Sequence, residues 1–132
     1  RDVSALAGCA ALRTLDLSYS YSLTDVSALA GCPALHTLIL KATRVRDVSA
    51  LAGCAALRTL DLSYSYSLTD VSVLVSCPSL HKLILSHCNK VTDVSALANC
   101  ASLHTLNLNK CPGVTDVSGL RCVAHSPGGR ER

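Results

Sequence analysis

Leucine recurs along the chain in the pattern Leu-x-x-Leu-x-Leu, with polar or small residues between the leucines. The five motifs occupy residues 12–17, 35–40, 57–62, 80–85 and 103–108. Alternation of this kind predicts a short strand whose leucines point toward a core and whose intervening residues point toward solvent. The strands are expected at residues 14–18, 37–41, 59–63, 82–86 and 105–109.

A second motif, Asp-Val-Ser, begins seven or eight residues after the last leucine of each leucine motif. It begins at residues 2, 25, 47, 70, 93 and 116, in steps of 23, 22, 23, 23 and 23. An Asp at this point can accept hydrogen bonds from backbone N–H groups as the N-cap of a short 3₁₀ or helical turn. Within such a turn, Val26 and Leu29 are three residues apart and are expected to face the core together.

The fixed period predicts a stack of repeats, in which each unit contacts only its neighbours and the strands form one parallel sheet. Residues 1–27 and 46–72 are identical, so part of the array is a recent duplication. We expect one elongated solenoid over residues 1–121. Residues 122–132 lack the leucine motif, and their Pro-Gly-Gly and charges are typical of a disordered polar tail. Because the chain contains no Met and starts within a repeat, we expect a fragment without its capping segments.

Composition narrows the class of protein. Apolar residues make up 49% of the chain, yet Phe, Trp and Met are absent, so the core must consist of Leu, Val, Ala and Cys. Twelve basic and nine acidic residues leave a net charge of +3, which is too small and too dispersed to indicate a nucleic-acid partner. No apolar run is long enough for a membrane span, and the start of the chain does not resemble a signal peptide.

The units resemble leucine-rich repeats of two subtypes. Residues 106–116 (Leu-x-Leu-x-x-Cys-x-x-Val-Thr-Asp) resemble the cysteine-containing class of F-box substrate receptors. Residues 38–49 (Leu-x-Leu-x-x-Thr-x-Val-x-Asp-Val-Ser) are closer to bacterial internalins. The resemblance implies an α/β repeat solenoid that is right-handed, with five short parallel strands on the concave side and 3₁₀ or short helical turns on the convex side. It also implies recognition of a protein ligand by the concave face.

One position departs from the family pattern. The Asn that usually follows the strand is replaced by a hydroxyl or thiol residue in every unit: Ser20, Thr43, Ser65, Cys88 and Cys111. Hydroxyls can still bond the turn backbone, whereas thiols are weak donors. We therefore expect poorer hydrogen bonding in the fourth and fifth units.

The eight cysteines are interpreted as packing residues. Five of them, at 9, 32, 54, 77 and 100, share one repeat position, and no Cys-x-x-Cys occurs, so neither a zinc site nor a cofactor is expected. Cys88 and Cys111 lie in neighbouring repeats, where a disulfide is conceivable but two buried thiols are preferred. Reduced cysteines favour an intracellular origin.

Two other clusters have a possible chemical role. Asp16 and Asp61 project from strands separated by Ile39, which places them roughly 10 Å apart, a distance at which two carboxylates could flank a water as in inverting glycosidases. A solvated repeat position explains this pair better, because Asp61 is a duplicate of Asp16. Likewise, His81 and His104 are adjacent and could bind a metal, but a basic stripe along one rim is the preferred interpretation.

The remaining candidates are the outward positions of the strands and the residues just after them. They define a partner-binding surface on a non-enzymatic protein-interaction module, and Tyr and exposed Ile are the expected anchors. The alternative is a structural or self-associating segment of a larger surface or adaptor protein, joined end to end through uncapped sheet edges. The candidate residues are Asp16, Tyr19, Ile39, Lys41, Asp61, Tyr64, Lys82, Ile84, His87, Asn107 and Asn109.

Overall fold

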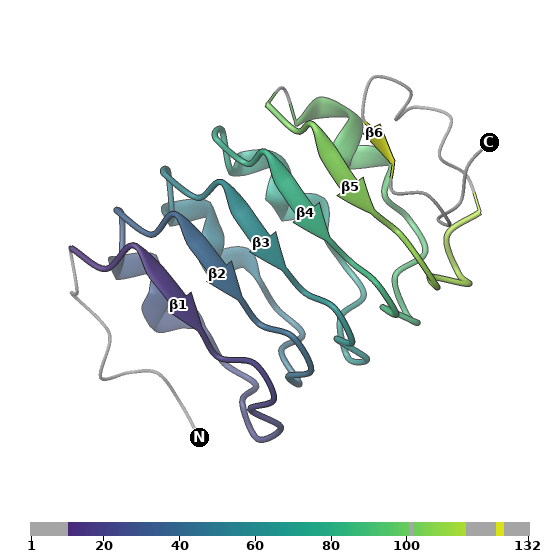
Figure 1. Ribbon diagram of the computed structural model, residues 1–132, viewed down its shortest axis with the longest axis horizontal. Coiled ribbons are helices and arrows are strands. Elements are labelled where there is room, and N and C mark those ends of the chain that lie inside the picture. The colour runs from purple at the N-terminus through teal and green to yellow at the C-terminus, as the bar shows by residue number, and fades with distance from the viewer. Residues whose placement is uncertain (1–10, 101, 116–123, 126–132) are drawn as a thin grey trace.

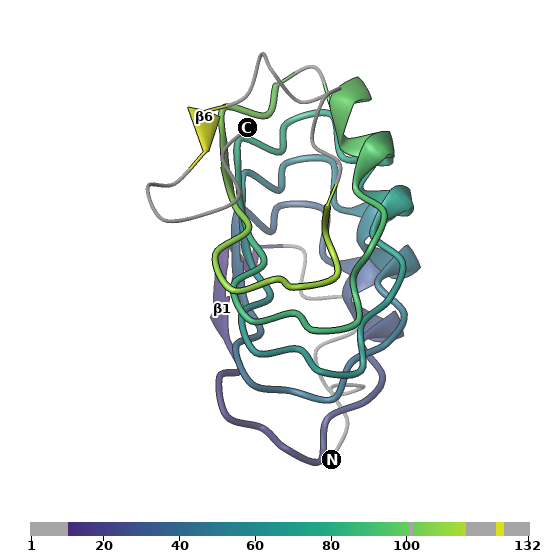
Figure 2. The ribbon, with the colours of Figure 1, turned by 90° about the vertical axis from the view of Figure 1, so that its right-hand side faces the viewer.

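The computed structural model describes residues 11–100 and 102–115, together with the backbone of residues 124–125. A parallel sheet forms one layer and a row of short 3₁₀ helices forms the other, with the chain passing from one layer to the other in every repeat (Figures 1 and 2). The strands are β1 (Thr14–Asp16), β2 (Thr37–Ile39), β3 (Thr59–Asp61), β4 (Lys82–Ile84), β5 (Thr105–Asn107) and β6 (Ala124–His125). The helices are η2 (Ser27–Gly31), η3 (Ser49–Gly53), η4 (Ser72–Ser76) and η5 (Ser95–Asn99).

The five predicted strands are confirmed, and they pair in sequence order. Each is two residues shorter than expected, yet the hydrogen-bond ladder runs further: the N–H of Leu17 donates to the carbonyl of Ile39 at 2.8 Å, and that of Tyr19 to Lys41 at 2.7 Å. A sixth strand, β6, was not expected. It pairs with Thr105 and Leu106 of β5, so this edge of β5 is covered over two residues.

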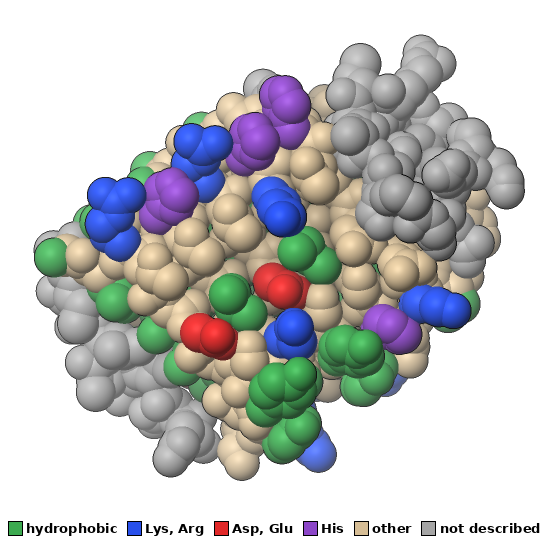
Figure 3. Space-filling model, in the orientation of Figure 1, with side chains coloured by type: hydrophobic (Ala, Val, Ile, Leu, Met, Phe, Trp, Pro, Cys, Tyr) green, Lys and Arg blue, Asp and Glu red, His purple; other side chains and the backbone are tan. Residues whose placement is uncertain are grey.

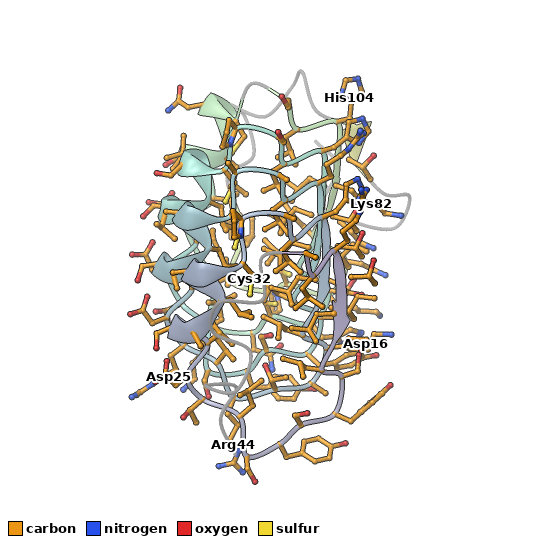
Figure 4. All side chains as sticks on the ribbon, turned by 90° about the vertical axis from the view of Figure 1, so that its left-hand side faces the viewer. Asp16, Asp25, Cys32, Arg44, Lys82 and His104 are labelled. Atoms are coloured by element: carbon orange, nitrogen blue, oxygen red, sulfur yellow. The ribbon has the colours of Figure 1, made fainter. Side chains whose placement is uncertain are left out.

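The core lies between the two layers and is built from repeated rows of Leu, Val and Cys. The motif leucines of β2 to β5 are buried, and so are Val26 and Leu29. The strand leucines and this turn pair therefore face the core, as predicted. Figure 4 shows Cys32 between the layers, with Asp25 on the helical side and Asp16 on the sheet side. Packing of identical aliphatic rows explains how the chain folds without an aromatic side chain in the described core.

In the four described copies of Asp-Val-Ser, the Asp organises the turn that leads into a 3₁₀ helix. The carboxylate oxygen Oδ1 accepts the N–H of the Ser two residues later, at 2.8 Å in Asp25 and 2.9 Å in Asp47. The helix itself begins after Val26, which makes no side-chain capping bond, so the Asp stands one residue before the N-cap position that we predicted. These hydrogen bonds lower the pKa of both carboxyl groups.

In the part of the chain that the structure describes, no helix is both long enough and apolar enough to cross a membrane.

Candidate protein-binding surface

The outward side chains of the strands form columns that run across the sheet. One column contains Asp16, Ile39, Asp61, Ile84 and Asn107, which lie opposite one another in the strand register. Asp16 and Asp61 are therefore separated by one strand, as predicted. Figure 4 shows Asp16 and Lys82 pointing away from the helical layer, and Figure 3 shows charged and hydrophobic side chains interspersed over this face. The sheet face thus offers alternating apolar and polar positions, one per repeat.

The polar members of this column also stabilise the turns that follow the strands. Oδ1 of Asp16 accepts both the N–H of Ser18, at 2.9 Å, and its hydroxyl. Asp61 does the same with Ser63, and Asn107 accepts the N–H of Asn109 at 2.8 Å. The hydrogen bonds to Ser18 lower the pKa of Asp16. The sequence interpretation missed this role, although an Asx residue followed two residues later by Ser or Asn is its visible signal.

Directly beyond the strands, the backbone turns through the left-handed region at the same position of all five described units. The φ angles lie between 59° and 63°, and none of these residues is Gly: they are Tyr19, Ala42, Tyr64, His87 and Lys110. Left-handed backbone is unfavourable for side chains with a Cβ, so the surrounding ladder must enforce it. This conformation could not be predicted from the sequence, because Gly and Asn, its usual markers, are absent from the column.

All four tyrosines of the chain lie on the surface at this turn edge. Their exposed fractions are 58% for Tyr19, 62% for Tyr21, 37% for Tyr64 and 51% for Tyr66. The rings nevertheless contact one another: Tyr64 and Tyr66 meet edge to face at 6.3 Å, and Tyr64 stacks on His87 at 4.4 Å and 10°. Folding does not require exposed rings, so their presence calls for another explanation.

The opposite edge of the sheet face carries the predicted basic stripe. Arg and His side chains follow one another from repeat to repeat along the upper left edge in Figure 3. The rings of His81 and His104 stack at 4.6 Å and 7°. Partial burial, followed by the charges of His104 and Arg58, lowers the pKa of His81. Across the described residues, no group of three or more His, Cys, Asp or Glu side chains converges as a metal site would require.

The six cysteines within residues 11–115 lie inside the solenoid. Cys88 and Cys111 are buried, and each donates its S–H to a leucine carbonyl of the preceding repeat, at 3.1 Å from Leu62 and 2.8 Å from Leu85. Cys54 and Cys77 make longer contacts of the same kind. Burial raises the pKa of Cys77 to about 11 and that of Cys88 to about 12.

This arrangement corrects our expectation for the turn position. The thiols in the fourth and fifth units are hydrogen-bonded, whereas the buried hydroxyls of Thr43 and Ser65 have no partner in the described structure. The carbon–sulfur bond is longer than the carbon–oxygen bond, which brings the sulfur atoms of Cys88 and Cys111 closer to the carbonyls of the preceding repeat.

The fold and the outward columns define a class of protein, the parallel-sheet repeat solenoid. The family model for leucine-rich repeats in two copies matches residues 55–99 and 78–122, which together span just over half of the chain. The chain therefore belongs to the leucine-rich repeat family, as its motifs indicated. Proteins of this family commonly mediate protein–protein interactions, and the fold is typically a non-enzymatic module.

Similar solved structures are also leucine-rich repeat proteins. An internalin (InlF) of Listeria monocytogenes is similar with a TM-score of 0.84 and 30% identity, over 94% of this chain and 36% of its own. Internalin C2 of the same species gives 0.82 and 32%, over 94% and 56%. A leucine-rich repeat protein of Leptospira interrogans shares the fold, with a TM-score of 0.81 at 17% identity, over 94% of this chain and 33% of its own.

The chain thus spans roughly a third to just over half of the length of these proteins. No curated protein matches it closely enough in sequence to count as a relative.

Proposed function

We propose that this chain is a non-enzymatic recognition module that binds a protein partner through the face of its sheet. The observation that carries the proposal is the placement of the tyrosines. The described core is entirely aliphatic and thiol, while every Tyr of the chain is exposed at one edge of the sheet face. Tyr is enriched at the energetically dominant positions of protein interfaces.

The geometry of the face supports this function. Ile39 and Ile84 are only partly buried and alternate with Asp16, Asp61 and Asn107 in one column. Apolar anchors among polar neighbours are typical of the core of a protein interface. Stacking of Tyr64 on His87 holds an anchor ring in place before binding, which reduces the entropy lost on association.

The first experiment locates the binding face. A photo-crosslinking amino acid replaces either Lys82, which is exposed on β4, or Ala98, which is exposed on η5, and each protein is irradiated in an extract of the source cells. Binding by the sheet face predicts a discrete adduct from position 82 and none from position 98. An adduct from position 98 alone, or from neither position, would contradict the proposal.

The second experiment measures how much Tyr64 and Ile84 contribute to the affinity for the partner. With the cross-linked partner in hand, replacing Tyr64 and Ile84 together by Ser should weaken binding by roughly 2–4 kcal/mol, as truncation of interface anchors does. The matched control replaces Val75, which is exposed on η4, by Ser and should leave the affinity unchanged.

A further inference from the structure

A hollow at the turn edge carries an inference beyond general binding by the face. It has a volume of about 300 Å³ and is lined by three tyrosines, Tyr21, Tyr64 and Tyr66, together with Ala42, Thr43, Arg44 and Ser67. Figure 3 shows hydrophobic side chains gathered at the lower edge of the sheet face, beyond the ends of the strands, with a basic side chain next to them. A volume of this order accommodates one side chain of a ligand.

The hollow exists because the second repeat is one residue shorter than its neighbours. From the left-handed position to the next buried aliphatic residue there are four steps in the other described units, as from Tyr64 to Leu68, but three from Ala42 to Val45. Ala42 is also the smallest side chain of its column. The large side chains on either side, contributed by the first and third repeats, therefore face each other across a gap.

The walls of the hollow are apolar and preformed. Tyr66 meets Tyr64 edge to face at 6.3 Å, and Tyr64 is fixed from its other side by His87. Aromatic walls held in this way bind an apolar group with little loss of side-chain freedom.

One charge stands at the rim. Arg44 is exposed, and Figure 4 shows its side chain extending from the turn edge into solvent. Within residues 11–100 and 102–115, no carboxylate pairs with its guanidinium group; the hydrogen bond that Arg44 makes there comes from its backbone N–H, which donates to Leu23. An unpaired guanidinium beside an apolar hollow fits a ligand that presents a carboxylate next to an apolar group.

We propose that this hollow receives an apolar side chain of the partner protein, and that an Asp or Glu next to it in the partner pairs with Arg44. The proposal rests on the proposed function, because it assigns the partner's anchor on the same face. It commits to a peptide of mixed apolar and acidic character. A purely acidic ligand would leave the tyrosine walls unused, and a purely apolar one would leave Arg44 without a counter-ion.

The test uses dipeptides as probes. The full chain is titrated with N-acetyl-Leu-Glu-amide, N-acetyl-Leu-Gln-amide and N-acetyl-Ser-Glu-amide, and the ring signals of tyrosine are followed by NMR. The chain has four Tyr and no Phe or Trp, so histidine is the only other source of aromatic ring signals, and labelling tyrosine alone removes that overlap. We expect saturable shifts for Tyr21, Tyr64 and Tyr66 with Leu-Glu, binding about fivefold weaker with Leu-Gln, and no saturation with Ser-Glu.

Two variants assign the effect to the hollow. Ala42→His fills the gap without removing any lining ring, and the backbone accepts it because His87 adopts the same φ of about 60°. This variant should abolish the Leu-Glu shifts. Arg44→Gln should retain binding but lose the preference for Glu over Gln, whereas the matched control Lys90→Gln, an exposed cation of another turn, should keep it.

The proposal is overturned if the wild-type chain shows no saturable shift with Leu-Glu, if Ser-Glu binds equally well, or if Ala42→His leaves binding unchanged. Its failure is distinct from failure of the proposed function. If the sheet face binds the partner but the hollow does not, cross-linking from position 82 still gives an adduct while the dipeptides cause no saturable shift. If the sheet face does not bind a partner, the adduct is missing whatever the dipeptides do.

Discussion

One half of the solenoid, the second and third units, differs from the other half, the fourth and fifth units, in the side chain that it buries in the turn after the strand. At the buried position that follows the left-handed residue of each turn, the second and third units place the hydroxyls of Thr43 and Ser65, and the fourth and fifth place the thiols of Cys88 and Cys111. The hydroxyls are buried without partners, while the thiols reach a carbonyl of the preceding repeat. Because a buried unsatisfied group costs roughly 1–3 kcal/mol, we expect the hydroxyl units to be less stable at this position than the thiol units.

The largest expected effect concerns the reactivity of the thiol half. Because burial raises the pKa of Cys88 to about 12, from an ordinary value of 9.0, its thiolate population at pH 8 falls roughly a thousandfold. We expect a thiol reagent at pH 8 to modify Cys88 at least a hundredfold more slowly in the native chain than in denaturant. Mass spectrometry of proteolytic fragments measures this, and rapid native labelling would place the thiol outside the core.

The next effect tests whether the two halves differ anywhere else. Leu60 in β3 and Leu83 in β4 are both fully buried and lie opposite each other in the register. Replacing either by Ala should lower the free energy of unfolding by about 3 kcal/mol, because each leaves a similar cavity among leucines. Urea denaturation compares the two variants. A disparity above about 1 kcal/mol would show that the halves differ in packing as well as in the turn position.

Exchange of the turn residues addresses the comparison directly. Ser65→Cys should raise the free energy of unfolding by about 1 kcal/mol by giving the buried group a reachable carbonyl, and Cys88→Ser should lower it by a similar amount. Ser65→Ala is the matched control, since it removes the unsatisfied hydroxyl without adding a bond. Equal gains in the Cys and Ala variants would mean that the sulfur contact contributes nothing beyond removal of the hydroxyl.

The sequence was sufficient for the periodic features. Leucine spacing predicted the five strands and their register, because a solenoid of equal repeats aligns equivalent residues automatically. It was insufficient for β6, since Ala124 and His125 carry no leucine pattern and parallel pairing uses backbone groups alone. The sequence also did not predict that the thiols rather than the hydroxyls find hydrogen-bond partners at the turn position. That outcome depends on fractions of an ångström between a donor and a carbonyl.

The candidate surface divides in the same way. The outward columns follow from alternation along the strands, and all eleven predicted binding residues occupy the sheet face or its turn edge. The hollow beside Ala42 does not follow from alternation, because it arises from a local deletion. Its signal was present in the sequence as one step of 22 residues among steps of 23, at the unit whose left-handed position holds the smallest side chain.

The smallest effect concerns a feature that both halves share. Asp47 and Asp93 precede equivalent helices, and hydrogen bonds from the following Ser lower the pKa of each below 3.8. A carboxyl group with a depressed folded pKa adds stability above its unfolded pKa, and this contribution is lost as the pH falls through the folded value. We therefore expect the urea midpoint to fall as the pH is lowered below about 4. Asp47→Asn and Asp93→Asn should each make this fall smaller.

The two Asn variants should behave alike, because an amide oxygen still accepts the Ser N–H but no longer titrates. The lowered pKa of His81 is common to the wild type and both variants, so its titration cancels in the comparison. If acid destabilised the Asp47→Asn protein as steeply as the wild type but spared Asp93→Asn, the Asp turns would not be equivalent. The contrast between the halves would then extend from the turn after each strand to the turn before each helix.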